Sequence, residues 1–227
     1  MTRGCSRPAD RALSGGVERA IDAVLFDFGG VIIGSPFAAI GAAGEAGGHD
    51  PTDVLDAMMG DYATDTDHPW HQLERGEIGV ADYGAFVRRE LADRAIELDF
   101  SLLASLYRDL QVHPEMVDRA RQLRADGYLT ALVTNNVREF GDAWRSIVPL
   151  DELFDVVVDS SEVGMRKPNP SIYQHALALL GGVSPGRAVF LDDAPGNVEG
   201  ARAAGLLAIL VVEPDQALAE LDAILKA

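Results

Sequence analysis

Five short runs of apolar residues along the chain predict buried parallel strands. Neighbouring residues within each run are apolar, so both faces of each strand are expected to be covered, as in a sheet with helices on both sides. Segments with helical spacing separate the later runs. Alternating strands and helices predict an α/β fold with a doubly wound, Rossmann-like parallel sheet. The five runs span residues 23–28, 128–133, 155–159, 188–192 and 206–212.

Start and stop signals frame the helices between the later strands. Residues 114–127 and 195–205 each begin at a proline and end at a glycine, which is typical of helix boundaries. In the segment 169–182, Asn169 is expected as the N-cap residue and Pro170 as the first helical residue. These signals support helical crossovers between parallel strands.

A long interval, residues 35–112, separates the first strand-like run from the second. Helical spacing is clear in YGAFVRREL and LLASLYRDL and weaker in AAIGAAGEAGG and PTDVLDAMMG. We therefore predict a small helical cap inserted at 35–112 into a core formed by residues 22–34 and 113–227. Residues 1–21 mix Arg, Gly, Ser and Pro without sustained periodicity and are expected to form a flexible N-terminal tail.

Composition narrows the classes of partner and compartment. The 19 basic and 36 acidic residues give a net charge of -17, which disfavours nucleic acid and anionic membranes as partners. A single cysteine, Cys5, excludes an internal disulfide and fits a reducing compartment. No apolar run approaches the roughly 18 residues of a membrane span, and residues 1–22 lack the apolar region of a signal peptide. We expect a cytoplasmic protein.

Polar residues follow three of the predicted strands at the point where each strand ends. Asp27 ends the first run, Thr134 and Asn135 follow the second, and Asp192 and Asp193 follow the fourth. Ligands of an open parallel sheet bind beyond the carboxyl ends of its strands, so these side chains are expected to meet at one site. One acidic strand end is ordinary helix capping, but three on adjacent strands favour a shared function.

The three carboxylates of Asp27, Asp192 and Asp193 need a counter-charge. An isolated buried carboxylate is costly to desolvate, and like charges at short range cannot all stay ionised. A divalent cation supplies that charge. Hard oxygen ligands with room for water favour Mg²⁺, which we predict at this edge of the sheet.

Other residues near the same edge complete a phosphate cradle. Gly29 and Gly30 allow a sharp turn after the first strand, and Lys167 supplies positive charge from the loop GMRKPNP after the third strand. Thr134, together with the backbone amides of a helix predicted to begin near Asn136, is expected to form an anion site. These groups predict a phosphoryl-binding site that faces a carboxylate nucleophile.

The residues of this edge resemble the motifs of the haloacid dehalogenase superfamily of aspartate-nucleophile phosphohydrolases. FDFGGV, VTNN, RKPNP and FLDDAPGN occur in order, with a helical insertion after the first, as in the helical-cap phosphatases of subfamily IA. The segments ERGEI, GMRKP and IYQHAL are similar to a branch that includes the phosphatase domain of soluble epoxide hydrolases and bacterial sugar-phosphate phosphatases. The resemblance implies a Mg²⁺-dependent hydrolase of phosphate monoesters that acts on a small phosphorylated metabolite, such as a sugar phosphate.

The resemblance also implies a role for each residue. Asp27 is expected to be the catalytic nucleophile and to form an aspartyl-phosphate, while Lys167 neutralises both Asp27 and the phosphoryl group. Asn197 is expected to orient a metal-bound water. The implied metal-site residues are Asp27, Gly29, Asp192, Asp193 and Asn197, and the implied substrate-binding residues are Phe28, Gly29, Thr134, Asn135 and Lys167.

Gly29 departs from the superfamily pattern. Most of its phosphatases carry a second aspartate two residues after the nucleophile, as general acid and then base, and such help contributes typically ~10² to 10⁴ in rate. Either the leaving group needs little protonation, as in an anomeric or acyl phosphate, or the cap supplies a proton donor. The cap candidates in and beside WHQLERGEI are His68, His71, Glu74 and Glu77.

Two further interpretations stay open. A 2-haloacid dehalogenase needs neither a leaving-group acid nor a metal, but such enzymes lack the paired aspartates seen here as Asp192 and Asp193. A non-catalytic binding protein of the same fold would have lost activity with the acid, although Asp27, Thr134 and Lys167 are retained. The expected partner is a small phosphorylated substrate, with no nucleic acid or membrane, and the chain is expected to be a monomer or homodimer.

Overall fold

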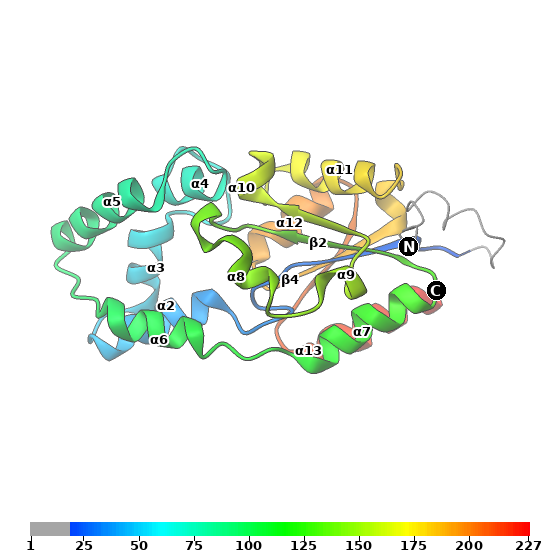
Figure 1. Ribbon diagram of the computed structural model, residues 1–227, viewed down its shortest axis with the longest axis horizontal. Coiled ribbons are helices and arrows are strands. Elements are labelled where there is room, and N and C mark those ends of the chain that lie inside the picture. Colours follow the sequence, from blue (N-terminus) through cyan, green and yellow to red (C-terminus); the bar gives the residue numbers. More distant parts are fainter. Residues whose placement is uncertain (1–18) are drawn as a thin grey trace, which may run out of the picture.

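The computed structural model describes residues 19–227 and contains a parallel five-stranded sheet with the strand order β3-β2-β1-β4-β5 (Figure 1). β1 lies at the centre, where Ala23 pairs with both Leu129 and Ala188. β3 and β5 form the two edges. The predicted fold class is confirmed. The strands are β1 (Ala23–Phe26), β2 (Leu129–Thr134), β3 (Val156–Asp159), β4 (Ala188–Asp192) and β5 (Leu207–Leu210).

Helices cover both faces of the sheet because successive side chains of each strand point to opposite sides. Val24 and Phe26 of β1 belong to an apolar cluster with residues of α7 and α13, whereas Ala23 and Leu25 pack with residues of α11 and α12. Figure 1 shows the two pairs of helices on opposite sides of the strands. Their bounds are α7 (Pro114–Ala125), α11 (Pro170–Leu179), α12 (Pro195–Ala203) and α13 (Pro214–Lys226).

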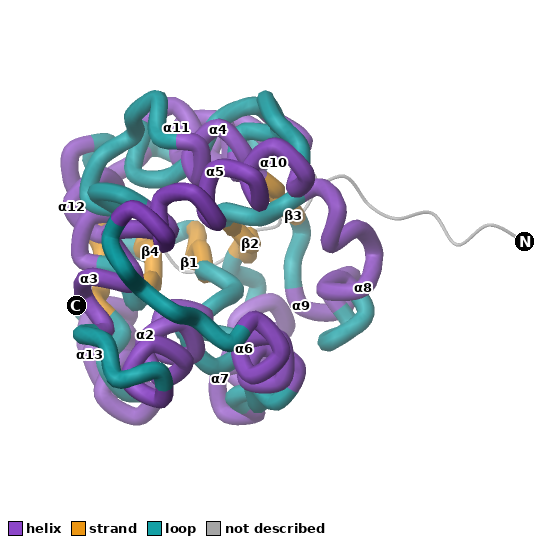
Figure 2. Tube along the Cα trace, turned by 90° about the vertical axis from the view of Figure 1, so that its left-hand side faces the viewer, coloured by secondary structure: helices purple, strands orange, loops and turns teal. Residues whose placement is uncertain are grey.

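The helices between β1 and β2 form a separate layer with its own apolar cluster, which includes Ile40, Val54, Leu73 and Val87. They follow the carboxyl end of β1, and Figure 2 shows them in front of the strands when the molecule is viewed from that end. We call this layer the cap. Its helices are α2 (Pro36–Ala46), α3 (Pro51–Met59), α4 (Pro69–Glu74), α5 (Val80–Asp93) and α6 (Phe100–Arg108).

The helix predicted to begin near Asn136 begins slightly later, at Arg138, and consists of two short pieces. The Asn136 N–H donates to Ser160 Oγ at 2.9 Å, and the Val137 N–H donates to Asn136 Oδ1 at 2.8 Å. The side chains of Ser160 and Asn136 therefore occupy both amides, and the chain continues as a loop before two short helical turns. The short elements after β2, β3 and α11 are η1 (Arg138–Phe140), α8 (Gly141–Arg145), α9 (Leu150–Leu153), α10 (Ser160–Val163) and η2 (Pro185–Arg187).

Residues 1–18 of the predicted N-terminal tail lie outside the described residues. Near the start of the described chain, Ile21 is buried in the core, and Arg19 Nη2 donates to the carbonyl of Asp126 at 2.7 Å. Residues 19–21 are therefore attached to the core. Within 19–227, each helix is too short or too polar to cross a membrane.

Candidate active site

The side chains at the carboxyl ends of β1, β2 and β4 meet below the cap, around Asp27. Asp27 directly follows β1 and is 8% exposed. Its Oδ1 accepts a hydrogen bond of 2.6 Å from the Phe28 N–H and lies 2.7 Å from Lys167 Nζ. Burial raises the pKa of Asp27 well above its ordinary value, although Lys167 acts against this. Lys167 is therefore the partner that a buried Asp27 requires.

Lys167 bridges two aspartates. Its Nζ also lies 2.7 Å from Asp192 Oδ2, and both side chains are completely buried. Burial alone would lower the pKa of Lys167, but Asp192 and Asp27 outweigh it and raise that pKa. The lysine stays charged and holds the residues after β1 and β4 at a fixed separation.

Asp192 has donors on both carboxylate oxygens. Its Oδ1 accepts from the Ala194 N–H at 2.8 Å, and Asn197 Nδ2 lies 3.1 Å from both oxygens. Lys167 Nζ also donates to Asp192 Oδ2. Asn197 Oδ1 is buried without a hydrogen-bond partner. Asp192 is thus mainly an anchor for Lys167 and Asn197, and the amide oxygen of Asn197 is left to face a ligand.

Asp193 differs from its neighbour. Ser35 Oγ donates to Asp193 Oδ2 at 2.6 Å, whereas the buried Oδ1 has no hydrogen-bond partner. Burial, and then the charge of Asp192, raise the pKa of Asp193 to about 6. A Cβ at Gly30, whose φ is +73°, would lie 2.0 Å from Asp193 Oδ2. Glycine at position 30 therefore lets this carboxylate reach the loop after β1.

The carboxylate cluster fits a divalent cation. Oxygen atoms of Asp27, Asp192 and Asp193 lie within 4.8 Å of one another. One lysine cation faces three carboxylates, and Asp193 Oδ1 is an acceptor with no donor. An unpaired buried carboxylate oxygen is costly in the absence of a cation. Hard oxygen donors of this kind are the ligands of Mg²⁺ and similar ions.

The residues predicted to bind the phosphoryl group lie around Lys167, but two of their side chains are occupied. Thr134 ends β2 and is buried. Asn135 Oδ1 accepts from the Lys167 N–H at 2.8 Å, while its Nδ2 donates to the Lys167 carbonyl and to Tyr62 Oη, both at 3.0 Å. The Phe28 ring packs edge-on against Trp144. A phosphoryl contact by Asn135 or Phe28 would therefore use the backbone N–H.

A buried polar network joins the cap to this site. Tyr62 Oη donates to Glu74 Oε1 at 2.9 Å, and Arg166 Nε lies 2.7 Å from Glu74 Oε2. Arg166 is fully buried, and its guanidinium lies 4.8 Å from the centre of the Tyr62 ring. Sequence reasoning named Glu74 but missed Tyr62 and Arg166. The only local signal is the position of Arg166 directly before Lys167 in RKPNP.

The other cap candidates make local contacts. His68 Nδ1 accepts from the Trp70 N–H at the start of α4, and His71 Nδ1 accepts from the Thr66 N–H. Burial lowers the pKa of His71 to about 4, so the ring is neutral near pH 7. Glu77 pairs with Arg75 on the surface. Of the four candidates, Glu74 is the one that contacts Tyr62 and Arg166.

Gly29 has little room for a side chain. A Cβ at this position would lie 2.8 Å from Cδ and 3.0 Å from Cγ of Pro36, the first residue of α2. Atoms of a proline ring cannot rotate away as the end of a flexible side chain can. The entry into the cap therefore occupies the space that an aspartate at position 29 would need.

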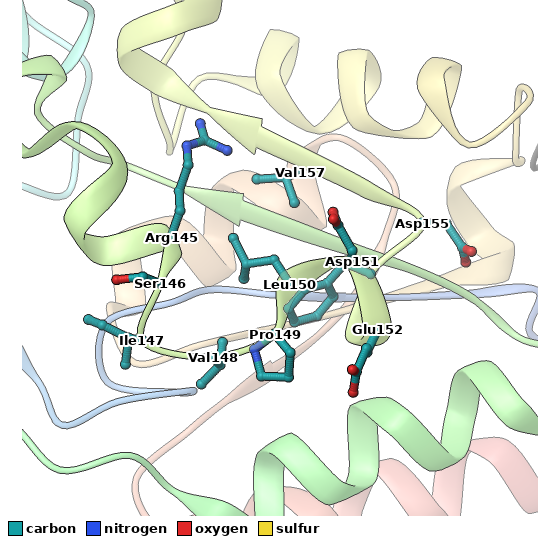
Figure 3. A pocket seen from close by; sticks show the side chains of 11 residues that line it. Arg145, Ser146, Ile147, Val148, Pro149, Leu150, Asp151, Glu152, Asp155 and Val157 are labelled. Atoms are coloured by element: carbon teal, nitrogen blue, oxygen red, sulfur yellow. The ribbon is translucent and has the colours of Figure 1, made fainter. Parts of the chain in front are cut away.

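Two open cavities lie near the sheet. The first, of about 870 Å³, lies beside β3 and α9 (Figure 3) and includes Arg145, Leu150 and Val157 but none of the predicted site residues. The second, of about 400 Å³, borders Asp193 together with residues such as Ser35. The second cavity therefore borders the carboxylate cluster at Asp193.

Known proteins with similar sequences include much longer ones. The chain is 36% identical over 222 residues, 93% of its length, to Acyl-CoA dehydrogenase family member 10 of Mus musculus. It is 30% identical over 181 residues, 74% of its length, to Bifunctional epoxide hydrolase 2 of Mus musculus. The matched regions are only 20% and 32% of those relatives. The other relatives include phosphatases as well as a haloacid dehalogenase.

A solved structure and a family description agree with this geometry. A HAD-like family hydrolase from Porphyromonas gingivalis superposes with a TM-score of 0.60 at 25% identity, over 89% of this chain and 98% of that one. The family description "haloacid dehalogenase-like hydrolase" matches residues 21–205, which include Asp27, Lys167 and Asp192. The chain therefore belongs to the haloacid dehalogenase-like hydrolases.

Proposed function

We propose that this hydrolase is a Mg²⁺-dependent phosphatase that forms an aspartyl-phosphate on Asp27. The observation that supports this most directly is the buried Asp193 Oδ1, an acceptor without a donor in a cluster of three carboxylates. If the reaction used no cation, nothing would neutralise the excess negative charge of this cluster. A bound Mg²⁺ would neutralise the phosphoryl oxygens and hold them near the nucleophile.

The residues of this chain divide the remaining tasks. Both contacts of Asp27 fall on Oδ1, so Oδ2 is the oxygen available to attack phosphorus in line with the leaving group. Lys167 holds Asp27 in place and neutralises charge that develops on the phosphoryl oxygens. Asn135 fixes the Lys167 backbone from both sides, so the lysine is positioned before substrate binds.

A haloacid dehalogenase is the second candidate, because Gly29 removes the leaving-group acid and a halide needs none. Dehalogenases are also among the relatives and structural neighbours of this chain. The paired Asp192 and Asp193 argue against it, since displacement of halide by a carboxylate uses no cation.

The test measures hydrolysis of para-nitrophenyl phosphate with Mg²⁺ and with EDTA. Wild type is expected to lose its activity in EDTA, and Asp27→Asn to be inactive in both conditions. Asp99→Asn is a matched control, because Asp99 caps α6 and asparagine caps equally well. Halide release from 2-chloropropionate in EDTA would instead identify a dehalogenase. A folded wild type with neither activity would indicate a non-catalytic binding protein.

The substrate class follows from the cap. Cap residues contact Asn135 and Arg166 directly, so a bound substrate lies between the cap and the sheet and is shielded from water. A small phosphorylated metabolite, such as a sugar phosphate, suits this position. The charge of -17 disfavours nucleic acid and anionic membranes. A panel of small phosphate esters would identify the preferred leaving group.

A further inference from the structure

The position of Tyr62 is suited to replace the acid that is missing at Gly29. Pro36 fills the space next to Gly29, and the next residue, Phe37, packs edge-on against the Tyr62 ring at 4.8 Å between ring centres. The Tyr62 hydroxyl then reaches Asn135, which directly follows Thr134. Tyr62 therefore reaches from the cap to the residue next to Thr134, close to the predicted phosphoryl-binding site.

On the basis of the phosphatase function proposed above, we propose that Tyr62 is the proton donor to the leaving-group oxygen. In this proposal Glu74 is the carboxyl group that supplies its proton through Tyr62 and later recovers it. Tyr62 contacts the substrate and is a catalytic residue, whereas Glu74 acts through Tyr62. Arg166 holds the carboxylate form of Glu74 at 2.7 Å.

The number of hydrogen-bond donors at Tyr62 explains why Glu74 must carry the proton. A phenol has one proton to donate and two lone pairs to accept. Asn135 Nδ2 already donates to the Tyr62 oxygen at 3.0 Å. When Glu74 is ionised, the Tyr62 O–H donates its one proton in the 2.9 Å hydrogen bond to Glu74 Oε1. When Glu74 is protonated, it donates to Tyr62, and the Tyr62 O–H becomes free to point at the substrate.

The proton balance closes over the two half-reactions. In the first, Asp27 Oδ2 bonds to phosphorus and the bond from phosphorus to the ester oxygen breaks. The Tyr62 proton moves to that oxygen, the Glu74 proton moves to Tyr62, and Glu74 becomes a carboxylate. In the second, water bonds to phosphorus and the bond to Asp27 breaks. The water proton passes to Tyr62, and the Tyr62 proton returns to Glu74.

The charged and titratable groups around Glu74 allow both protonation states. Burial raises the pKa of Glu74, while Arg166, then Tyr62 and Lys167, lower it, and the net direction is upward. Tyr83 on α5 and Tyr107 on α6 also face Glu74, and burial keeps both phenols neutral. Burial, and then the charges of Glu74 and Asp27, raise the pKa of Tyr62, so a Tyr62 that has given up its proton takes up another rather than remaining ionised.

The experiment compares three phosphate esters in the holoenzyme with Mg²⁺: para-nitrophenyl, phenyl and glycerol phosphate. Tyr62→Phe keeps the ring contacts and removes only the hydroxyl. It is expected to lower kcat for glycerol phosphate about 100-fold, and for para-nitrophenyl phosphate less than about threefold, because nitrophenolate leaves without a proton. The control is Tyr83→Phe, which also removes a hydroxyl in the cap, hydrogen-bonded to the Met58 carbonyl, and should behave as wild type.

The pH profile for glycerol phosphate supplies a second readout. Wild-type kcat should fall on the alkaline side as Glu74 loses its proton, and this limb should be absent in Glu74→Gln and in Tyr62→Phe. Equal losses for all three esters in Tyr62→Phe, or no loss, would overturn the relay and leave the phosphatase proposal intact. A wild type that hydrolyses only para-nitrophenyl phosphate would also overturn the relay and leave the phosphatase proposal intact. A wild type that hydrolyses none of them overturns the phosphatase proposal and the relay with it.

Discussion

Asp192 and Asp193 are neighbours in the chain but have opposite environments. Asp192 receives hydrogen bonds from Lys167, Asn197 and a backbone amide, whereas Asp193 receives one from Ser35 and keeps an unpaired buried oxygen. Adjacent residues of a loop point in different directions, so one aspartate anchors the sheet edge and the other is exposed to a ligand. The two carboxylates should therefore respond differently to substitution and to metal.

Asp193→Asn is expected to stabilise the metal-free protein at neutral pH. The native pKa of Asp193 is about 6, above its ordinary value of 3.8, so the native state binds this proton more tightly than the unfolded chain. The stabilisation of the native state by this tighter proton binding is complete below about pH 4 and is lost as pH rises through 6. In EDTA at pH 7.5 the variant should gain about 2 kcal/mol in the free energy of unfolding, measured with urea.

Magnesium should reverse the order of stability of wild type and Asp193→Asn. Mg²⁺ binds only the native state, so it should raise the melting temperature of wild type and leave Asp193→Asn nearly unchanged. Asp67→Asn, an exposed change in the cap, should respond to Mg²⁺ as wild type does. A wild type more stable than Asp193→Asn in EDTA at pH 7.5 would contradict this account.

Gly29→Asp should not restore the usual acid, because Pro36 occupies its space. Overpacking of this kind costs typically about 1–3 kcal/mol, so the variant should unfold at lower urea and hydrolyse glycerol phosphate no faster than wild type. Gly29→Asp combined with Pro36→Ala should recover part of that stability, and Pro36→Ala alone serves as the control. Faster hydrolysis by Gly29→Asp alone would show that Pro36 moves aside.

At the scale of elements, sequence patterns located all five strands but not all of their ends. β4 has the predicted bounds, whereas β1, β3 and β5 are shorter than predicted, and the edge strands β3 and β5 are partly exposed. Helix α4 was missed because its six residues are too few to show a period. The helix expected near Asn136 begins only at Arg138, because a side chain from residue 160, distant in sequence, accepts from the Asn136 amide.

The N-cap of α11 links helix stability to the loop that carries Lys167. Asn169 accepts from the Ser171 N–H at 3.0 Å, as predicted, and its Nδ2 lies 3.2 Å from Asp65 of the cap. Asn169→Ala should lower the free energy of unfolding by about 1 kcal/mol in urea titrations. Asn169→Ser retains a cap but loses the Asp65 contact, so it should be close to wild type in stability. Equal losses in both variants would assign the effect to Asp65.

At the scale of the whole molecule, the contacts between cap and core had no signal in the sequence pattern. Glu74 and Arg166 are 92 positions apart, and Tyr62 and Asn135 are 73 apart. A local period reveals which face of a helix is buried, but not which residue of another layer it meets. The carboxylate cluster could be anticipated because parallel strands end at one edge, a constraint that the cap does not share.

The cap packs closely against the core where Gly196, near the start of α12, lies against Ala63. A Cβ at Gly196 would lie 2.5 Å from Ala63 Cα, and a backbone atom cannot rotate away. Gly196→Ala should therefore push the cap loop that holds Tyr62 away from Asn135. Misplacement by about 1 Å can cost up to about 100-fold in rate, so kcat/KM for phosphate esters should fall by a factor approaching this.

Gly186→Ala is the matched control for Gly196→Ala, because a Cβ there meets nothing within 4 Å and its site is far from the cap. Asp27, Asp192 and Asp193 belong to the core and not to the cap, so Gly196→Ala should keep Mg²⁺ binding, measured by calorimetry, while kcat/KM falls. Loss of both together would mean that α12 itself is displaced along with Asp192 and Asp193. Retention of full activity would mean that the cap need not approach α12 this closely during turnover, and that Tyr62 reaches the substrate from a more open arrangement.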